Sequence, residues 1–402
     1  MRYTSAVLHI VLTFSFIFLS LALPGCDFWK QTPDEIRGYS TTEISPKAFD
    51  TGTDTNGIFL LAGNENNLTL VWAENSGKDK AAIRFAELKD KNWVTNPASL
   101  TVPISTRLVS AVRDSQNKLH VLWLFRSEEK DNPRRATLAT FDEGKWQEPK
   151  NLYKGAASVY FATMALGQDD TLHLIWSAVI SHNSAILFRT VKNGQMGDLQ
   201  KLALPSNEST FWQPAIATAP DGKIHVAYTK MDIGKASLEY QSADATGKNW
   251  SKPTSISSLS TRDSHPFLDV TPNGEVRLYF VSGKQNEMIG VSVNQDGAWS
   301  EPEVVAQREG AVLYVTSQVD ATGRSHLSWM ERSRNGEKNS VHFISGQPGS
   351  WADPIYLPSQ DGFGYGIQTS VHQNALYLTW KVRKDGETPR AFWQNLVLLP
   401  KN

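Results

Sequence analysis

The chain has 402 residues, and its 40 Lys and Arg residues almost balance its 41 Asp and Glu residues. Such a balance produces no net field that would attract a polyanion, which argues against a generic nucleic-acid binder. With one cysteine, the chain cannot form an internal disulfide.

The N-terminal segment has the pattern of an export signal. Arg2 precedes a nearly uncharged apolar run over residues 7–23, which ends in Leu23-Pro24-Gly25-Cys26. This ending resembles the lipobox of bacterial lipoproteins, in which the cysteine is lipidated. The resemblance implies a signal peptide over residues 1–25, an acylated Cys26 and a tether over residues 26–37. We therefore expect a lipoprotein of the cell envelope that is anchored in a membrane and faces the periplasm or the exterior. An ordinary signal peptide or a signal anchor is the alternative.

Beyond the tether, one short pattern recurs seven times. Each copy is an alternating strand with a polar side chain three residues before a large aromatic anchor, and successive anchors lie 51, 53, 52, 52, 49 and 51 residues apart. So regular a period indicates a repeat architecture. The anchors are Trp72, Trp123, Trp176, Tyr228, Phe280, Trp329 and Trp380.

Each period contains strands and no helix. The apolar residues alternate with period two, and a second aromatic residue, usually followed by proline, lies between the anchors. In the second repeat we expect strands over residues 109–113, 119–125, 136–141 and 146–153. Tight-turn dipeptides such as Asn193-Gly194 and Asp221-Gly222 support short hairpins. We predict an all-β fold, a seven-bladed β-propeller of four-stranded antiparallel blades that spans residues 38–402.

The seventh repeat lacks its last strand. After Trp380 the chain has room for one further strand, at about residues 390–398. An N-terminal strand over residues 38–44 would supply the missing outer strand, close the ring and cover the exposed sheet edge.

The turns before the second aromatic residues resemble degenerate Asp-boxes, as in Asp142-Glu-Gly144-Lys-Trp146 and Asp296-Gly297-Ala-Trp299. Asp-boxes are typical of sialidase and BNR-repeat propellers, where they connect the third and fourth strands of a blade. The resemblance implies architecture more than chemistry, because sialidases have six blades and an early Arg-Ile-Pro phrase that this chain lacks.

Four histidines share one strand position in different blades. Because His120, His173, His225 and His326 belong to different repeats, they cannot converge on one metal, and we expect them to be structural. No phosphate-binding glycine loop, zinc motif or nucleophile elbow occurs, so no metal or other cofactor is predicted.

Function is expected where the repeats differ, about 15 residues before each anchor. We place these positions in loops that meet around one mouth of the central channel. Their aromatic and polar mixture suits a concave ligand site, although the same side chains could simply fill the channel. The predicted ligand-binding residues are Arg107, Tyr160, Phe161, Phe211, Trp212, Arg262, His265, Tyr314 and Tyr365.

For catalysis the sequence offers only weak candidates. Asp263, Tyr365 and Tyr314 could act as acid or nucleophile, and Arg107, Arg262 and Arg308 could hold a carboxylate. We expect an envelope propeller that binds a carbohydrate or a protein or peptide ligand, without established catalysis. The alternatives are a sialidase-like glycoside hydrolase and a structural scaffold of an envelope complex.

Overall fold

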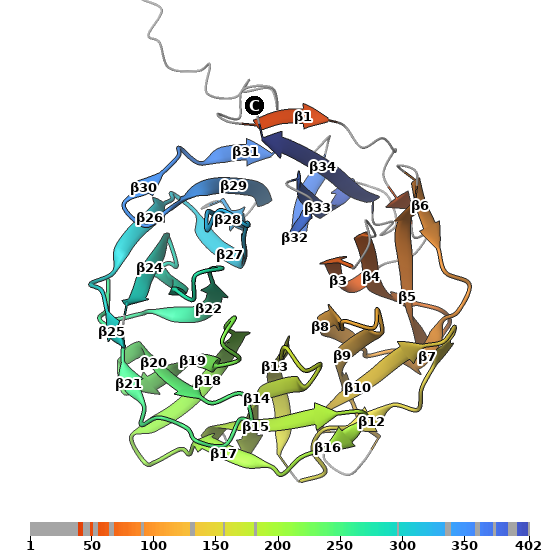
Figure 1. Ribbon diagram of the computed structural model, residues 1–402, viewed down its shortest axis with the longest axis horizontal. Helices are drawn as coiled ribbons and strands as arrows, with labels where there is room; N and C mark the ends of the chain where they lie inside the picture. The colour runs from red at the N-terminus through yellow and green to blue at the C-terminus, as the bar shows by residue number, and fades with distance from the viewer. Residues whose placement is uncertain are drawn as a thin grey trace, which may run out of the picture.

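The structure is a computed structural model in which strands surround a central axis (Figure 1). It describes residues 39–42, 49–50, 55–63, 68–89, 92–128, 133–155, 157–180, 183–295, 297–333, 339–357, 362–372, 375–384 and 392–400. The predicted signal peptide, Cys26 and the tether lie outside these ranges. Within them, no helix is long and apolar enough to cross a membrane.

The described strands form seven antiparallel sheets, which confirms the β-propeller. We number the blades by repeat, and strand order runs outward from the axis (Figure 1). Blade 1 has β3 (Thr55–Ala62), β4 (Leu68–Asn75), β5 (Lys80–Lys89), β6 (Asn92–Thr95) and β7 (Leu100–Pro103). Blade 2 has β8 (Arg107–Arg113), β9 (Leu119–Arg126), β10 (Arg134–Asp142), β11 (Lys145–Trp146) and β12 (Lys150–Asn151). Blade 3 has β13 (Ser158–Leu166), β14 (Leu172–Ile180), β15 (Asn183–Lys192), β16 (Gln195–Met196) and β17 (Gln200–Ala203).

The second half of the ring repeats this order. Blade 4 has β18 (Ser209–Thr218), β19 (Ile224–Asp232), β20 (Lys235–Ala243) and β21 (Thr254–Ser255). Blade 5 has β22 (Ser264–Val270), β23 (Val276–Ser282), β24 (Met288–Gln295), β25 (Ala298–Trp299) and β26 (Glu303–Gln307). Blade 6 has β27 (Ala311–Val319), β28 (Ser325–Arg332), β29 (Asn339–Gln347), β30 (Ser350–Trp351) and β31 (Ile355–Leu357). Blade 7 has β32 (Gly362–His372), β33 (Ala375–Lys384) and β34 (Phe392–Pro400), with β1 (Tyr39–Thr42) and β2 (Phe49–Asp50) on its outer edge.

The N-terminal strand closes the ring as the seventh repeat predicts. β1 pairs antiparallel with β34, with Tyr39 opposite Pro400 and Thr42 opposite Val397. The last blade is thus assembled from strands that are far apart in sequence, and β1 and β34 lie side by side in Figure 1. Pairing of the two ends covers an edge that would otherwise be open to another strand.

One expectation about the outer strand was wrong. Residues 146–153 do not form a single strand, because two short strands, β11 and β12, pair separately with β10. Pro149 lies between them and has no backbone N–H to donate, so the ladder cannot continue through it. Five other blades have an outer strand interrupted in the same region.

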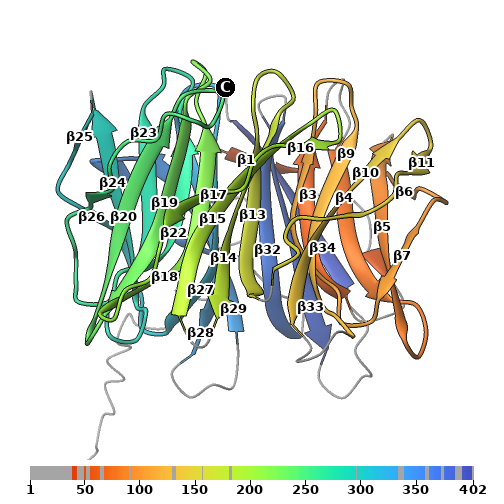
Figure 2. The same cartoon turned by 90° about the horizontal axis from the view of Figure 1, so that it is seen from below.

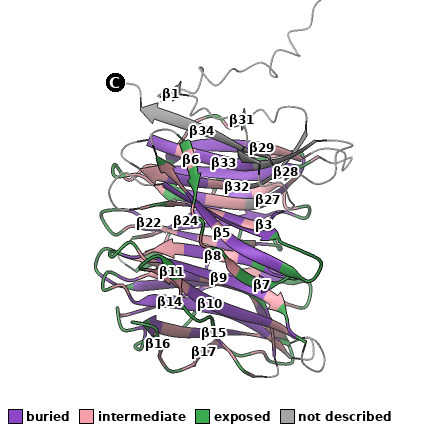
Figure 3. Cartoon of the chain, turned by 90° about the vertical axis from the view of Figure 1, so that its right-hand side faces the viewer, coloured by how far each residue is buried: buried purple, intermediate pink, exposed green. Residues whose placement is uncertain are grey.

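The core lies between neighbouring sheets. The anchors Trp176 and Trp329 are fully buried, and one hydrophobic cluster joins Tyr279 of blade 5 to Trp329 of blade 6. The second aromatic residues contact the preceding blade: Trp146 packs edge-on against Phe85, with ring centroids 6.2 Å apart. Buried residues follow strands such as β5, β9 and β10 in the blades that face the viewer in Figure 3.

The four repeat histidines are buried within their own blades, as expected. His326 contacts Asp320 and Ser345, at 3.1 Å each. His225 Nδ1 lies 2.6 Å from the hydroxyl of Tyr240. Burial lowers the pKa of His173 and of His225 to about 4, so both rings stay neutral at pH 7.

Candidate functional site

The innermost strand of every blade contains a β-bulge near its start. Each bulge shifts the pairing with the second strand at the position 15 or so residues before the anchor. The shifts lie between Thr55 and Ile58, Leu108 and Ser110, Val159 and Ala162, Trp212 and Ala215, Ser264 and Phe267, Leu313 and Thr316, and Tyr365 and Gln368. The informative positions therefore belong to strands and not to loops, which corrects the expectation from sequence.

A bulge interrupts the regular alternation of side chains, because two residues of the inner strand oppose one residue of the second strand. The bulge residues differ in their surroundings: Ile367 of blade 7 is buried in a core cluster, whereas Phe161 of blade 3 is partly exposed. We call the end of the channel at which the innermost strands begin the mouth. All blades run between the mouth and a far face (Figure 2).

Three of the predicted ligand-binding residues meet at the mouth between blades 3 and 4. The ring of Trp212 stands edge-on to both Tyr160 and Phe161, at centroid distances of 6.0 and 6.3 Å. Tyr160 is 38 % exposed and Phe161 is 36 % exposed, so both rings keep free surface. The guanidinium of Arg134, from blade 2, lies 4.7 Å from the centre of the Tyr160 ring. The mouth thus has an aromatic cluster, defined as Tyr160, Phe161 and Trp212.

A polar pair adjoins this cluster. Gln213 and His265 have φ angles of 51° and 52°, a left-handed conformation that is uncommon outside glycine. Gln213 Nε2 lies 2.8 Å from His265 Nε2, and Gln213 Oε1 accepts from the His265 backbone N–H at 3.2 Å and from Thr229 Oγ1 at 3.0 Å. Backbone strain of this kind costs about 1–3 kcal/mol per residue and gathers at functional sites.

The far face is tied together by bonds between blades. Ser115 of blade 2 donates its backbone N–H to Asp170 of blade 3 at 2.9 Å. Arg113 reaches back to Thr69 at 2.8 Å, and Arg277 reaches forward to the carbonyl of Gly323 at 2.8 Å. These bonds use the polar groups of the far face for assembly, so the mouth is the better candidate for ligand binding.

Asp263 is structural in this geometry. Its carboxylate is 1 % exposed and accepts hydrogen bonds from the backbone N–H groups of Leu259 and Ser260 and from the hydroxyl of Ser282. These donors occupy the carboxylate and hold the loop that leads into β22. An acid in this state has no free oxygen to offer a substrate in the mouth.

Phe211 and the predicted arginines lie in different local environments. Phe211 is buried against Tyr228, with ring centroids 5.7 Å apart, so its side chain belongs to the core. Arg308 is ion-paired with Glu331 at 2.7 Å, and Arg262 donates to the carbonyl of Lys284 at 3.4 Å. Arg107 is exposed at the start of β8. Arg308 and Arg262 are therefore each held by a contact of their own, and the carboxylate clamp of the enzyme hypothesis stays a prediction.

Two predicted tyrosines are placed only by their backbones. Tyr314 and Tyr365 lie in β27 and β32 at the bulge position, and their side chains lie outside the described part of the structure. Among the described residues no group of three His, Cys, Asp or Glu side chains could hold a metal ion.

Sequence reasoning did not select Gln213 as a site residue. A signal was present, because Gln213 and His265 each precede a proline inside an otherwise regular strand. Proline within a sheet is found at edges and bulges, so Pro214 and Pro266 mark the two strained positions.

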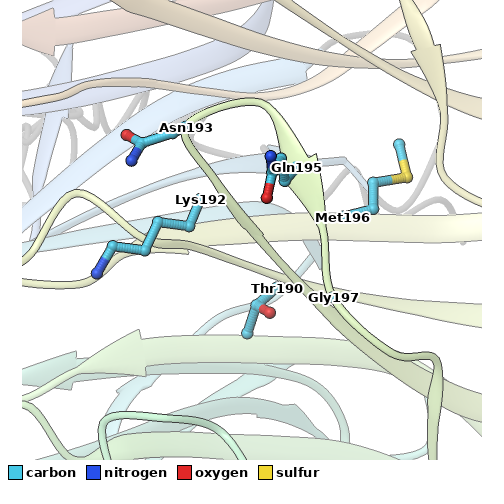
Figure 4. A pocket seen from close by; sticks show the side chains of 6 residues that line it. All are labelled: Thr190, Lys192, Asn193, Gln195, Met196 and Gly197. Atoms are coloured by element: carbon cyan, nitrogen blue, oxygen red, sulfur yellow. The ribbon is translucent and has the colours of Figure 1, made fainter.

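A hollow of about 350 Å³ lies elsewhere, at the outer hairpin of blade 3. It is lined by Thr190, Lys192, Asn193, Gln195, Met196 and Gly197 and opens beside the turn between β15 and β16 (Figure 4). Lys192, its one charged residue, is already paired with Asp169 at 2.5 Å. The side chains that line this hollow do not form a combination that ligand binding or catalysis would require.

Comparisons with known proteins support the fold. No family model matches the chain, and no curated protein matches it. A PL25 ulvan lyase bound to -[GlcA(1-4)Rha3S]- is similar with a TM-score of 0.61 at 8 % identity, over 88 % of this chain and 95 % of that one. The polysaccharide lyase Uly1 has a TM-score of 0.55 at 12 % identity, over 86 % and 90 %. A leech intramolecular trans-sialidase complexed with 2,7-anhydro-Neu5Ac has a TM-score of 0.50 at 9 % identity, over 89 % and 92 %.

Proposed function

We propose that this propeller binds a carbohydrate at its mouth, with the aromatic cluster as the platform and the Gln213–His265 pair as its polar edge. The observation that carries the proposal is the meeting of Tyr160, Phe161 and Trp212 at the bulges of two neighbouring blades. The C–H faces of a sugar ring stack on exposed aromatic rings, while hydroxyl groups need nearby donors and acceptors. The aromatic cluster meets the first requirement, and the second amide N–H of Gln213, beyond the one directed at His265, can donate to a sugar hydroxyl.

The similar structures support a saccharide over a peptide. The PL25 ulvan lyase has an acidic disaccharide repeat bound to it, and the leech trans-sialidase has a sialic acid derivative. Both share the propeller architecture with this chain. The proposal is binding without turnover, and it is supported by the occupied carboxylate of Asp263.

The proposal is tested by screening the protein on an array of neutral and acidic glycans. Tyr160→Ala combined with Trp212→Ala is expected to abolish binding and to leave the melting temperature within about 2 °C, because neither ring is fully buried. Tyr356→Ala is the matched control, since Tyr356 is 37 % exposed on the outer strand β31 of blade 6.

Three results would count against the proposal. Binding that survives the double substitution would remove the aromatic cluster as the platform. A large loss of stability would identify these rings as channel filling. Turnover of a bound glycan, seen as new reducing ends or unsaturated products, would favour an enzyme.

We also propose that the chain is anchored to a membrane of the cell envelope through an acylated Cys26. The apolar run of residues 7–23 and the position of the single cysteine support this proposal. Mass spectrometry of the N-terminal peptide from the native host would detect the acyl groups. Cys26→Ser should remove the acyl groups from this peptide, and an unmodified cysteine in the wild-type chain would reject the proposal.

A further inference from the structure

Blade 2 has three arginines at the mouth, and one of them, Arg134, contacts the aromatic cluster. Arg107 is the first residue of β8, Arg126 is the last of β9 and Arg134 is the first of β10, so all three lie at the mouth end of adjacent strands. Strand alternation places them on one face of the sheet. Leu124 and Ala136, two residues from Arg126 and Arg134, pack into the core shared with blade 3, and Leu108 faces blade 1. The three arginines therefore point toward blade 3, where Tyr160 stands.

Two of these arginines are direct neighbours across the ladder. Arg126 and Arg134 are paired residues of β9 and β10. Side chains at such positions start only about 4.5–5.5 Å apart, and like charges there repel each other. Within the described part of the chain, neither these two arginines nor Arg107 has a carboxylate within ion-pair distance. An anion that binds between these side chains would relieve the repulsion.

Arg134 links this charge to the proposed saccharide platform. Its guanidinium carbon lies 4.7 Å from the centre of the Tyr160 ring. A guanidinium that contacts a ring through its face keeps N–H donors along its edge, and these fit carboxylate and sulfate groups. The positive charge of Arg134 therefore lies next to the aromatic ring on which a sugar would stack.

We propose that Arg107, Arg126 and Arg134 form an anion subsite, which makes the ligand of the mouth an acidic saccharide that carries carboxylate or sulfate groups. The inference rests on the proposed function and adds its ligand class. The ring of the saccharide lies on the aromatic cluster, and its acid group lies against blade 2. Neutral saccharides use the platform alone and bind more weakly.

The experiment compares two probes that differ only in charge. One is a tetrasaccharide of galacturonic acid, and the other is the same tetrasaccharide with its carboxyl groups reduced to alcohols. Calorimetry is expected to show at least tenfold tighter binding of the acidic probe, which is about 1.4 kcal/mol, because its carboxylates accept charge-assisted hydrogen bonds from the arginines. Added salt should weaken binding of the acidic probe and leave binding of the reduced probe unchanged.

Arg126→Gln combined with Arg134→Gln is expected to abolish this preference and to leave binding of the reduced probe intact. The melting temperature should stay the same or rise, since the substitutions remove a repulsive pair. Arg332→Gln is the matched control, because Arg332 is exposed at the last position of β28 in blade 6, where it faces Asn339. The control should keep the wild-type preference.

The outcomes separate the two proposals. Equal binding of both probes by the wild-type protein overturns the acidic ligand and leaves the saccharide platform standing. Binding of neither probe, with an empty glycan array, overturns both. Equally tight binding of a single-stranded oligonucleotide that requires the same arginines would show a general polyanion site, and the inference would be wrong.

Discussion

Gln213 and His265 join the bulges of blades 4 and 5 through a hydrogen bond that forms only when the His265 ring is neutral. The amide nitrogen of Gln213 lies 2.8 Å from His265 Nε2, so the ring nitrogen has to accept. The amide cannot turn over, because its oxygen already accepts from the His265 backbone N–H and from Thr229. A protonated His265 would set one N–H against another.

The first prediction concerns this pair. Partial desolvation of the ring lowers the pKa of His265 below its usual value of 6.5. The bond is therefore intact at neutral pH and is lost as the pH falls through the lowered pKa. An NMR titration of the ring nitrogens should show this pKa, and Gln213→Ala should raise it, because the amide bonds only to the neutral form. A His265 pKa at or above 6.5 in the wild-type protein would contradict the arrangement.

The second prediction is a stability loss in mild acid from His173. Its folded pKa of about 4 lies below its unfolded value of 6.5, so the unfolded chain takes up the proton first. Stability therefore falls as the pH drops from 6.5 to 4, by about 1.4 kcal/mol per pH unit. His173→Phe keeps a ring that can stack on Phe188 and removes the proton site. Urea denaturation at several pH values should show a slope smaller by that amount, and an unchanged slope would reject the assignment.

The third prediction concerns the contact between the bulges of blades 1 and 2. Gly57 has φ 87°, and a Cβ atom there would come as near as 3.0 Å to the Cβ of Leu108 and nearer still to its carbonyl oxygen. Gly57→Ala should cost about 2–5 kcal/mol, from the left-handed backbone and the clash together. Gly144→Ala is the control, since Gly144 has φ 78° and open space around it. Equal losses in thermal denaturation would show that the inter-blade contact contributes nothing.

The fourth prediction concerns Asp263. Replacing it with Asn places an amide N–H against a backbone N–H of the loop 259–260, which should cost about 1–3 kcal/mol. Ser282→Ala removes one donor to the same carboxylate and should cost less. Chemical denaturation measures both. An Asp263→Asn protein of wild-type stability that had lost turnover of a glycan would return Asp263 to the catalytic candidates.

The sequence alone determined the architecture, because the same strand pattern occurs in seven repeats. The spacing of the anchors, the turn dipeptides and the missing last strand of repeat seven were enough to predict the blades and the closing strand. The structural role of the repeat histidines followed from the same comparison, since equivalent positions in different blades cannot meet. The packing inferred for one repeat therefore applies to the equivalent positions of the other repeats.

Only the tertiary structure defined the candidate site. Each bulge inserts a residue that breaks the strand alternation, so positions that the sequence analysis assigned to loops lie in strands. The adjacent residues Phe211 and Trp212 have different environments, because Phe211 lies in the core and Trp212 lies at the mouth. Neighbours across a blade boundary are about 50 residues apart in sequence, as Tyr160 and Trp212 are. Which side chains meet there depends on how two sheets pack, and a one-residue shift of register would exchange the buried face for the exposed one.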